Sequence, residues 1–464
     1  MTPNISNVDL CIIGAGPAGM AAALEATNKG LSVALLDEAP RPGGQIYRNV
    51  QRTTPALSAI LGPDYVHGAQ LADQFTAGAA AYLPQAVVWH IEATEPGYRL
   101  SYSLNGASHT LDAKSVIAAT GALERPMPLP GWTLPGVTTA GALQILLKSS
   151  GTVSDDLVLV GHGPLLLLLA AQLVAAGYPP RAIVETVPMA KYWKALPHLP
   201  AALRGWRYLL KGAAMLGKIR KAGVPFYGDA SDITLEGEAH LTAVSFTAGG
   251  KRQTLETSNA GLHHGVVPNQ QVSRLMRCAH RWHPSQHAFV PVLDAYGETS
   301  NLDFYVAGDG GSIRGARSAE WAGRLTALRI AQKSGIAVPQ KDINHFQRKL
   351  NEDAAARPFL ETLYAPAAQA LSPNDNTMIC RCEEVTAGQI RRAVADNAPG
   401  PNQVKSFLRT GMGPCQGRMC GLAVTALVVE GTGRTPDEVG YYRIRPPLKP
   451  LALSELAEYE PAAE

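Results

Sequence analysis

Apolar and polar positions in the first 36 residues follow a strand–helix–strand pattern. Residues 8–13 form an apolar, partly β-branched run of the kind that becomes a buried parallel strand. Residues 18–29 have helical composition and end at Gly30, and residues 31–36 supply a second apolar run. The pattern predicts one βαβ unit, with a glycine-rich turn between its first strand and its helix.

The same pattern returns in the middle of the chain. Residues 157–160 predict a strand, 165–176 a helix and 182–185 a further strand. Two such units predict two nucleotide-type domains. Glycines and a proline interrupt the apolar stretch between the first strand and the helix, so we expect buried elements here and no transmembrane segment.

Further apolar runs complete the predicted architecture, with strands at 86–91, 115–119 and 304–307 and a helix at 319–332. The predicted fold class is α/β, with two dinucleotide-binding domains and a small α-helical domain at the C-terminus. The predicted divisions are 1–118 with 266–335 for the first, discontinuous domain, 119–265 for the second, Rossmann-type domain, 336–376 for a connector, 377–445 for the small domain and 446–464 for a tail that lies along the surface.

Composition and charge narrow the class of protein. Of the 464 residues, 46% are apolar and 17% charged, as in an ordinary globular protein with more than one domain. The formal net charge of +3 is spread along the chain, so we do not expect nucleic acid as a partner. The first 24 residues lack the charged start of a signal peptide, and we expect a cytoplasmic location.

The turn of the first unit reads Gly14-Ala15-Gly16-Pro17-Ala18-Gly19. Such glycines allow a tight turn and the close approach of a pyrophosphate to a helix N-terminus, where free N–H groups favour anions. Asp37 ends the second strand, where a carboxylate can accept the hydroxyls of an adenosine ribose. In flavoproteins with two dinucleotide domains, a late aspartate like Asp309 meets the ribityl chain of FAD, and a segment like Thr120-Gly121 marks the exit to the second domain. FAD is therefore the cofactor that we predict.

Two residues close after the ribose strand, Gln45 and Arg48, are candidates to face the isoalloxazine ring, and packing within the loop is their alternative role. The predicted cofactor-binding residues are Gly14, Gly16, Pro17, Ala18, Gly19, Asp37, Glu38, Gly44, Gln45, Arg48, Thr120, Gly121, Gly308 and Asp309.

The second unit departs from the dinucleotide pattern. It reads Gly161-His162-Gly163-Pro164-Leu165-Leu166, and a leucine at the third glycine position should disturb the close packing of helix on strand. Glu185 does occupy the position of the ribose acceptor. A working NAD site and a nicotinamide domain kept for structure or subunit contact both remain open.

Four cysteines near the C-terminus predict a metal centre. Cys380 and Cys382 form C-x-C, and Cys415 and Cys420 form C-x4-C after 32 intervening residues. Thiolates in close pairs suit a shared metal centre, and neighbouring basic residues and glycines suit an iron–sulfur cluster. We predict these four residues as ligands of a [2Fe-2S] cluster. A four-thiolate zinc site and cysteines without metal are the alternatives.

The basic residues near the cysteines are Arg381, Lys405, Arg409 and Arg418. Within this small domain, Thr386 with Gln389 and Thr435 with Glu438 predict capping boxes at the starts of two helices.

A redox dithiol of the kind that disulfide reductases need beside the flavin is missing from the sequence. No cysteine occurs between Cys11, in the first strand, and Cys278, which has no partner pattern. The sequence therefore excludes the activity of thioredoxin reductase but not its fold.

Nearly the whole chain resembles the α subunits of heteromeric, dye-linked opine and imino-acid dehydrogenases, which include D-hydroxyproline dehydrogenase, octopine and nopaline oxidases and bacterial cyanide synthase. The segments that carry the resemblance are 36–38, 42–48, 120–126, 130–137, 265–269, 307–310 and the cysteine-containing domain. The last of these is similar to bacterioferritin-associated ferredoxin. The resemblance implies a flavoprotein fold like that of glutathione and thioredoxin reductases.

The same resemblance implies a partner, a β subunit similar to D-amino-acid oxidases that carries its own FAD and the substrate site; a small third subunit is a further expectation. Related α subunits, like those of heterotetrameric sarcosine oxidase, hold NAD or ATP in a nucleotide site and share an FMN with the β subunit. These cofactors are the alternatives to FAD, which Asp309 and the Gly-Gly-Gln segment at 43–45 favour here.

The implied function is electron transfer. The complex would oxidise an opine or an imino or amino acid, such as octopine, nopaline or D-hydroxyproline, and pass electrons through flavin and cluster to a dye or quinone-type acceptor. No substrate clamp or catalytic base is evident in this chain, so we predict no catalytic residue in it. The alternatives are an autonomous NAD(P)H-dependent flavin oxidoreductase and a non-catalytic scaffold.

Overall fold

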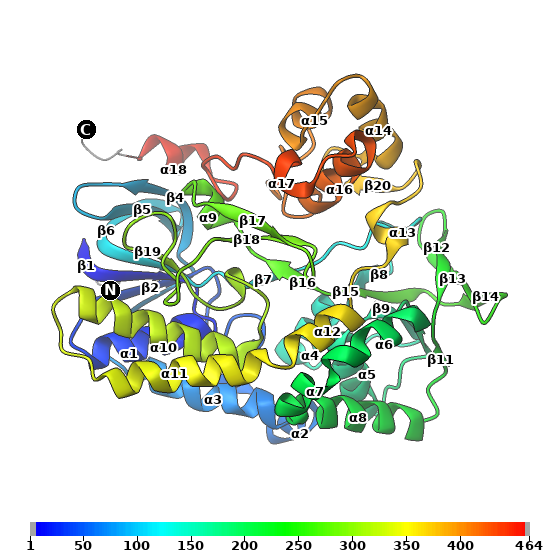
Figure 1. Cartoon of the computed structure of the whole chain (residues 1–464), viewed down its shortest axis with the longest axis horizontal. Coiled ribbons are helices and arrows are strands. Elements are labelled where there is room, and N and C mark those ends of the chain that lie inside the picture. The colour runs from blue at the N-terminus through cyan, green and yellow to red at the C-terminus, as the bar shows by residue number, and fades with distance from the viewer. Residues whose placement is uncertain (1–5, 460–464) are drawn as a thin grey trace.

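A seven-stranded sheet forms the centre of the N-terminal part of the protein, in the computed structural model that describes residues 6–459 (Figure 1). Its order is β3-β2-β1-β6-β5-β4, and β19 pairs with the C-terminal half of β6. The strands are β1 (Asn7–Ile13), β2 (Val33–Asp37), β3 (Ala81–Pro84), β4 (Val87–Ala93), β5 (Tyr98–Leu104), β6 (Ala107–Ala118) and β19 (Phe304–Val306).

The parallel part of this sheet brings three strand ends together. Ile13 of β1 lies opposite Ala118 of β6, and Ala118 lies opposite Val306 of β19. Because these strands are parallel, the loops that follow them emerge at one edge of the sheet, where ligands of open α/β sheets bind.

Helices α1 (Pro17–Asn28) and α10 (Ala316–Lys333) pack closely against each other beside this sheet. A Cβ added to Gly323 of α10 would lie 2.1 Å from the carbonyl oxygen of Ala18, so a glycine is needed at the crossing. The layer is completed by α2 (Pro55–Leu61), α3 (Pro63–Thr76) and α11 (Gln340–Ala354).

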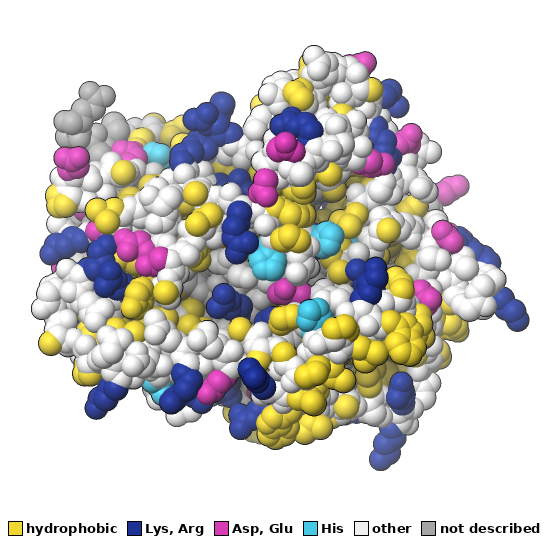
Figure 2. Space-filling view, viewed as in Figure 1, with side chains coloured by type: hydrophobic (Ala, Val, Ile, Leu, Met, Phe, Trp, Pro, Cys, Tyr) yellow, Lys and Arg dark blue, Asp and Glu magenta, His cyan; other side chains and the backbone are white. Residues whose placement is uncertain are grey.

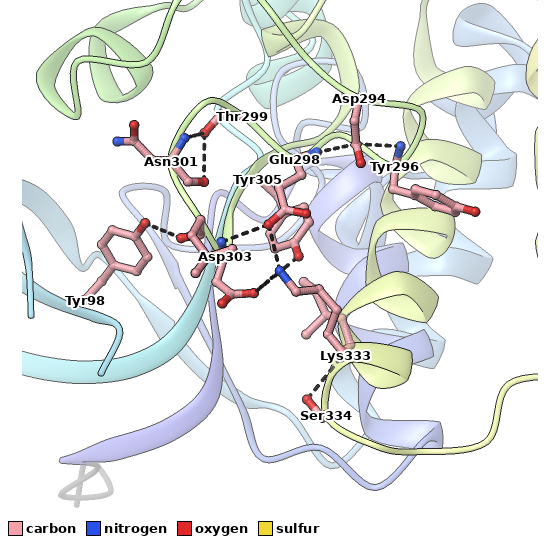
Figure 3. A network of polar contacts seen from close by, with 12 residues as sticks. Tyr98, Asp294, Tyr296, Glu298, Thr299, Asn301, Asp303, Tyr305, Lys333 and Ser334 are labelled. Atoms are coloured by element: carbon pink, nitrogen blue, oxygen red, sulfur yellow. Dashed lines mark hydrogen bonds and ion pairs between the residues drawn. The ribbon is translucent and has the colours of Figure 1, made fainter. Parts of the chain in front are cut away.

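A polar network fixes the end of α10 to the loop before β19 (Figure 3). Lys333 Nζ lies 2.7 Å from Glu298 Oε1 and 2.6 Å from Asp303 Oδ1. Tyr98 donates its hydroxyl proton to the carbonyl oxygen of Leu302 at 2.5 Å. The network therefore holds β19 in the position from which the Gly308-Asp309 turn leaves the sheet.

The second sheet is parallel, with the order β11-β10-β9-β15-β8. Its strands are β8 (Val137–Thr139), β9 (Leu157–His162), β10 (Ala182–Glu185), β11 (Phe226–Tyr227) and β15 (Asn259–His264). Beside it lie α4 (Ala140–Ser150), α5 (Pro164–Ala175), α6 (Met189–Ala195), α7 (Leu199–Ala202) and α8 (Trp206–Lys221), and a three-stranded antiparallel sheet of β12 (Ser231–Gly237), β13 (Leu241–Ala248) and β14 (Lys251–Glu256). The two predicted βαβ units are thus both present.

Short elements return the chain to the first sheet. They are β7 (Ala122–Glu124), β16 (Val266–Pro268), α9 (Gln271–Leu275), β17 (His280–His283) and β18 (Ala288–Pro291). The segment after α11 contains α12 (Arg357–Leu363) and α13 (Ala368–Leu371).

The C-terminal helical domain, here called the cluster domain, lies above both sheets in Figure 1. It consists of β20 (Met378–Cys380), β21 (Val385–Thr386), α14 (Ala387–Ala395), α15 (Pro401–Leu408), α16 (Gly421–Thr432) and α17 (Pro436–Val439). Both predicted capping boxes are confirmed, at Thr386 and at Thr435.

The tail runs back along the first sheet, as expected, and contains α18 (Leu453–Ala457). The Leu448 N–H donates to the carbonyl oxygen of Trp89 in β4 at 2.8 Å. Among residues 6–459, no helix combines the length and the apolar composition needed to cross a membrane.

Candidate cofactor sites

The glycine turn between β1 and α1 has space at one of its three glycines. A Cβ on Gly14 would lie 2.5 Å from the carbonyl oxygen of Ala119, and a Cβ on Gly19 would lie 1.8 Å from that of Gly14. Next to Gly16 there is no atom within 4 Å. Gly14 and Gly19 therefore allow the chain to pack, whereas Gly16 leaves open the space in front of α1, which Pro17 begins.

Asp37, at the end of β2, accepts two backbone hydrogen bonds. Its Oδ2 lies 2.5 Å from the amide nitrogen of Ala15 and its Oδ1 2.6 Å from that of Ala39. Burial raises the pKa of this carboxyl, and the two N–H groups oppose that rise. Each oxygen retains a lone pair, so the side chain can hold the turn and still accept a ribose hydroxyl. Glu38 points to solvent and pairs with Lys449 at 2.5 Å.

The loop after β2 lies over the glycine turn. The Gly43 N–H donates to the carbonyl oxygen of Ala15 at 2.8 Å, and a Cβ on Gly44 would lie 2.9 Å from the Cα of Gly16. Gln45 is exposed, and its carbonyl oxygen accepts a hydrogen bond from Lys148 Nζ at 3.2 Å. The structure therefore places Gly44 and Gln45 beside the expected pyrophosphate position.

Lys148 is a residue of this site that the sequence did not reveal. Its side chain is 3% exposed, donates to Gln144 Oε1 at 2.8 Å, and pairs with no carboxylate among the described residues. Burial and the nearby Arg48 lower the pKa of Lys148 to about 7. The buried Arg48 Nε also lacks a hydrogen-bond partner in the described chain. Two cations without carboxylate partners favour an anionic ligand here.

The remaining predicted residues meet this site from the ends of β6 and β19. Thr120 donates its hydroxyl proton to the carbonyl oxygen of Asn269 at 3.3 Å, and Gly121, at φ +66°, has no atom within 4 Å of an added Cβ. Asp309 Oδ1 accepts hydrogen bonds from the amides of Arg314 and Gly315, both at 2.8 Å.

Gly308 makes this convergence possible, because an added Cβ would lie 2.9 Å from the Cβ of Ala18. The open space at Gly16 and Gly121, the free N–H groups of α1 and the two unpaired cations together fit a dinucleotide such as FAD.

The four predicted metal ligands lie in one place, at β20 and in the loop before α16. Cys380 is beside Cys420, and Cys382 is beside Cys415. Each structural pair therefore joins one cysteine of the C-x-C motif to one of the C-x4-C motif. No group of three or more potential ligands surrounds a single ion-sized position in residues 6–459. Two facing pairs suit a two-iron cluster better than one tetrahedral zinc ion.

Hydrogen bonds and charge favour thiolates at this site. The neighbouring Cys420 thiol, together with the N–H groups of Gly411, Glu383 and Cys382, lowers the pKa of Cys380 to about 6, although burial opposes this. The Tyr442 hydroxyl lies 3.6 Å from Cys420 Sγ. These donors fit the sulfur atoms of a cluster.

Glycines let the loops come this close. A Cβ on Gly413 would lie 2.3 Å from the Cβ of Cys382, and a Cβ on Gly417 would lie 2.6 Å from the ring of Tyr442. Of the predicted basic residues, Arg418 donates to the carbonyl oxygen of Cys415 at 3.2 Å, whereas Arg381 lies over the ring of Trp132, 5.5 Å from its centroid.

A chain of hydrogen bonds connects the dinucleotide site with the cysteine loop. Thr120 contacts Asn269, as described above, and Asn269 Oδ1 accepts from the Gln271 N–H at 3.4 Å. Gln271 Nε2 then donates to the carbonyl oxygen of Gln416 at 3.3 Å. Gln416 follows Cys415 directly, so the two cofactor sites are linked through α9.

Arg274 of α9 strengthens this contact between the domains. Its guanidinium lies 4.9 Å from the ring centroid of Phe289 and 4.5 Å from that of Tyr441 in the cluster domain. Such stacking of a buried arginine between aromatic rings fixes the orientation of the two domains.

The second βαβ unit keeps the glycine turn but not an open phosphate position. A Cβ on Gly161 would lie 1.8 Å from the carbonyl oxygen of His263, and Leu166 is buried in the core beneath α5. Glu185 is buried at the end of β10, where burial raises the pKa of its carboxyl and the Tyr192 hydroxyl donates to it at 3.2 Å. A cavity of about 550 Å³, lined largely by aromatic and aliphatic side chains, opens beside Glu185.

The segment after α12 covers the turn at the start of α5. The ring of Tyr364 stacks on His162, with centroids 6.2 Å apart, and the Ala367 N–H donates to His264 Nε2. Gln369 then bonds to both backbone groups of Ile233, at 3.0 and 2.8 Å. A dinucleotide pyrophosphate at this turn would have to displace part of the protein's own chain.

Two family models match the sequence. Residues 8–323 match the model described as pyridine nucleotide-disulphide oxidoreductase, and residues 378–430 match the BFD-like [2Fe-2S] binding domain. These matches confirm the predicted fold class, two dinucleotide-binding domains followed by a small iron–sulfur domain, and agree with a flavin and a [2Fe-2S] cluster as cofactors.

Curated relatives extend the likeness over nearly the whole chain. The A subunit of opine oxidase from Rhizobium meliloti is 43% identical over 463 residues, covering 97% of this chain and 87% of that protein. The HcnB subunit of hydrogen cyanide synthase from Pseudomonas aeruginosa is 31% identical over 467 residues, covering 97% and 98%. The resemblance predicted from the sequence motifs is confirmed.

Among solved structures, L-proline dehydrogenase from P. horikoshii superposes with a TM-score of 0.72 at 18% identity, over 97% of this chain and 79% of that one. At this level of identity the likeness concerns the fold, which here includes the cluster domain as well as both dinucleotide domains.

Proposed function

Because this chain belongs to the pyridine nucleotide-disulphide oxidoreductase family and to the family of opine oxidase A subunits, it is an oxidoreductase subunit, and we propose that it is the electron-transfer subunit of an amine-oxidising complex. The observation that carries the proposal is the link from Thr120 through Asn269 and Gln271 to Gln416, which joins the dinucleotide site to the cysteine loop within one polypeptide.

Bound FAD and a [2Fe-2S] cluster would supply electron storage and one-electron transfer, which no side chain of this protein can provide. The protein's own residues bind and orient these groups. The N–H groups at the start of α1, with Lys148 and Arg48, would hold the pyrophosphate, and Asp37 and Asp309 would accept ribose and ribityl hydroxyls. Cys380, Cys382, Cys415 and Cys420 would hold the two irons.

The substrate and its site belong, in this proposal, to a partner. We propose a β subunit similar to D-amino-acid oxidases, with its own FAD, that oxidises an opine or an imino or amino acid such as octopine, nopaline or D-hydroxyproline. An FMN between the subunits and a small third subunit would be compatible with this arrangement. The acceptor would be a dye or a quinone-type molecule, and the complex would work in the cytoplasm.

The alternative of an autonomous NAD(P)H oxidoreductase has less support. It requires a dinucleotide at the second glycine turn, where Tyr364 and Ala367 lie against His162 and His264. Addition of NADH to the purified chain should therefore leave its flavin oxidised.

The test is a comparison of the chain alone with the chain co-expressed with an amino-acid-oxidase-like subunit. We expect dye reduction with one of the three substrates only in the co-expressed sample, and co-purification in a fixed ratio. Flavin reduction by substrate or NADH in the isolated chain would refute the proposal.

A variant ties that activity to the N-terminal site. Gly16→Val places a side chain in the open space before α1, so dinucleotide content and dye reduction should both be lost. Gly212→Val is the matched control, because no atom of α8 or its neighbours outside the helix lies within 4 Å of a Cβ there.

A further inference from the structure

Exposed hydrophobic side chains are concentrated in one part of the second dinucleotide domain. Of the eighteen large hydrophobic side chains that are exposed among residues 6–459, eight lie between 189 and 226. Figure 2 shows hydrophobic side chains gathered at the lower right, where Figure 1 places α6, α7 and α8. We call this surface, formed by residues 189–226, the basic apolar face.

Two helical stripes contribute most of the apolar area. They are Met189, Trp193 and Leu196 in and just after α6, and Leu203, Trp206 and Leu210 just before and in α8. Within each stripe the residues are three or four positions apart, so they share one side of a helix. The opposite side of α8 packs against α5 through the buried Ile219. Helix α8 is therefore apolar on two sides, and the described chain covers only one of them.

The same segment is strongly basic. Residues 186–228 contain eight lysines and arginines and no aspartate or glutamate. Positive charge is thus not spread evenly, contrary to the expectation from the overall composition. Among these eight cations, only Lys211 forms an ion pair within the described residues, with Asp64 at 2.5 Å. The other seven are available to an anionic partner.

We propose that the basic apolar face binds an anionic lipid bilayer, with the axes of α6 and α8 in the plane of the membrane surface. Interfacial helices of this kind combine tryptophan and leucine on one side with lysine and arginine at the margins. Trp193 and Trp206 are 69% and 53% exposed and belong to the residue type that prefers the headgroup region. The protein would then lie on the membrane without crossing it.

Other partners fit this surface less well. The cores of protein–protein interfaces are depleted in lysine, whereas Lys194 and Lys218 are exposed beside the apolar stripes. A nucleic acid would pair with the cations but would leave Leu203 and Leu210 without an apolar contact. A bilayer satisfies the charges and the aliphatic side chains together.

The experiment is co-sedimentation of the full-length chain, with any subunit that co-purifies and with matched flavin and iron content, with two kinds of vesicles. Pure phosphatidylcholine vesicles are compared with vesicles that contain phosphatidylglycerol as well. We expect binding to the anionic vesicles only, and release when the salt concentration is raised.

Variants locate the binding surface. Lys194→Glu with Lys218→Glu should weaken vesicle binding at least 10-fold, because each basic residue near the surface contributes about 5-fold. Trp193→Ser with Trp206→Ser should weaken it as well. The matched controls are Lys251→Glu in β14 and Phe407→Ser in α15, which are also exposed but lie outside the face, and they should bind like the parent protein.

Two results would overturn the proposal. One is the absence of binding to anionic vesicles by the folded protein at low salt. The other is an oligomer or subunit complex, seen by sedimentation velocity, that dissociates in the double tryptophan variant while vesicle binding is absent or unchanged. The second result would identify the face as a protein interface.

Discussion

Gly413→Ala should remove the iron–sulfur cluster and leave the flavin in place. The substitution adds a Cβ that would lie 2.3 Å from the Cβ and 3.1 Å from the Sγ of Cys382. Carbon atoms in contact prefer a separation of about 3.5–4.0 Å, so Cys382 has to move by roughly 1.2 Å or more.

A metal–thiolate bond cannot follow such a displacement. Metal–sulfur bonds are about 2.3 Å long and vary by only about 0.2 Å in sound sites. One iron would therefore lose a ligand, and the remaining cysteines would offer three thiolates instead of four. We expect iron and acid-labile sulfide to fall from about two of each per chain to well below one.

The assay is iron and sulfide analysis with visible and EPR spectra, alongside flavin content as an internal reference. Gly433→Ala, in the same domain, is the matched control, because its Cβ meets no atom within 4 Å. It carries only the cost of a left-handed residue, about 1 kcal/mol. Full iron content with a spectrum like that of the parent protein in Gly413→Ala would show that Cys382 is not a ligand or that its loop yields freely.

Three further predictions test the other parts of the site. Cys415→Ser should abolish or destabilise the cluster and spare the flavin, since the two sites lie in different domains; loss of both, measured by iron analysis and flavin release, would contradict their separation. Lys148→Met should leave the melting temperature nearly unchanged but weaken flavin retention on dilution about 10-fold or more, because an unpaired cation beside the pyrophosphate position is lost; undiminished retention would refute that role. Burial lowers the pKa of His162 and His280 to about 3 and that of His287 to about 4. The unfolded chain binds these protons below pH 6.5 and the folded chain does not, so stability should be constant above that pH and fall by up to about 4 kcal/mol per pH unit between about pH 6 and 4; an equal melting temperature at pH 7.5 and pH 5 would contradict this.

Local sequence patterns were enough to predict the strands, the glycine turns and the caps. The run at 8–13 and the glycines at 14, 16 and 19 depend on neighbours within a few residues, and so do the capping boxes at Thr386 and Thr435. The convergence of Asp37 with the Gly16 turn was also predictable, because the ends of adjacent parallel strands meet at one edge of a sheet.

Tertiary contacts lay beyond this reasoning. The pairing of Cys380 with Cys420, across the two motifs, depends on how β20 packs against the loop before α16. Lys148 stands in the last turn of α4, where a lysine is common, and only the fold places it beside Gln45. The contact of Tyr364 with His162 joins residues about 200 positions apart, and no local pattern signals it.

The tail that follows the cluster domain has a consequence for solubility. Strand β4 is the last in its sheet, and an edge strand presents unpaired backbone groups that can recruit a strand from another molecule. Leu448 bonds to the Trp89 backbone, and the ring of Tyr459 meets that of Trp89 with centroids 5.1 Å apart. The tail thus shields this edge. Truncation after residue 445 would uncover it, so shortened forms of the protein should self-associate through β4 even if both cofactor sites remain intact.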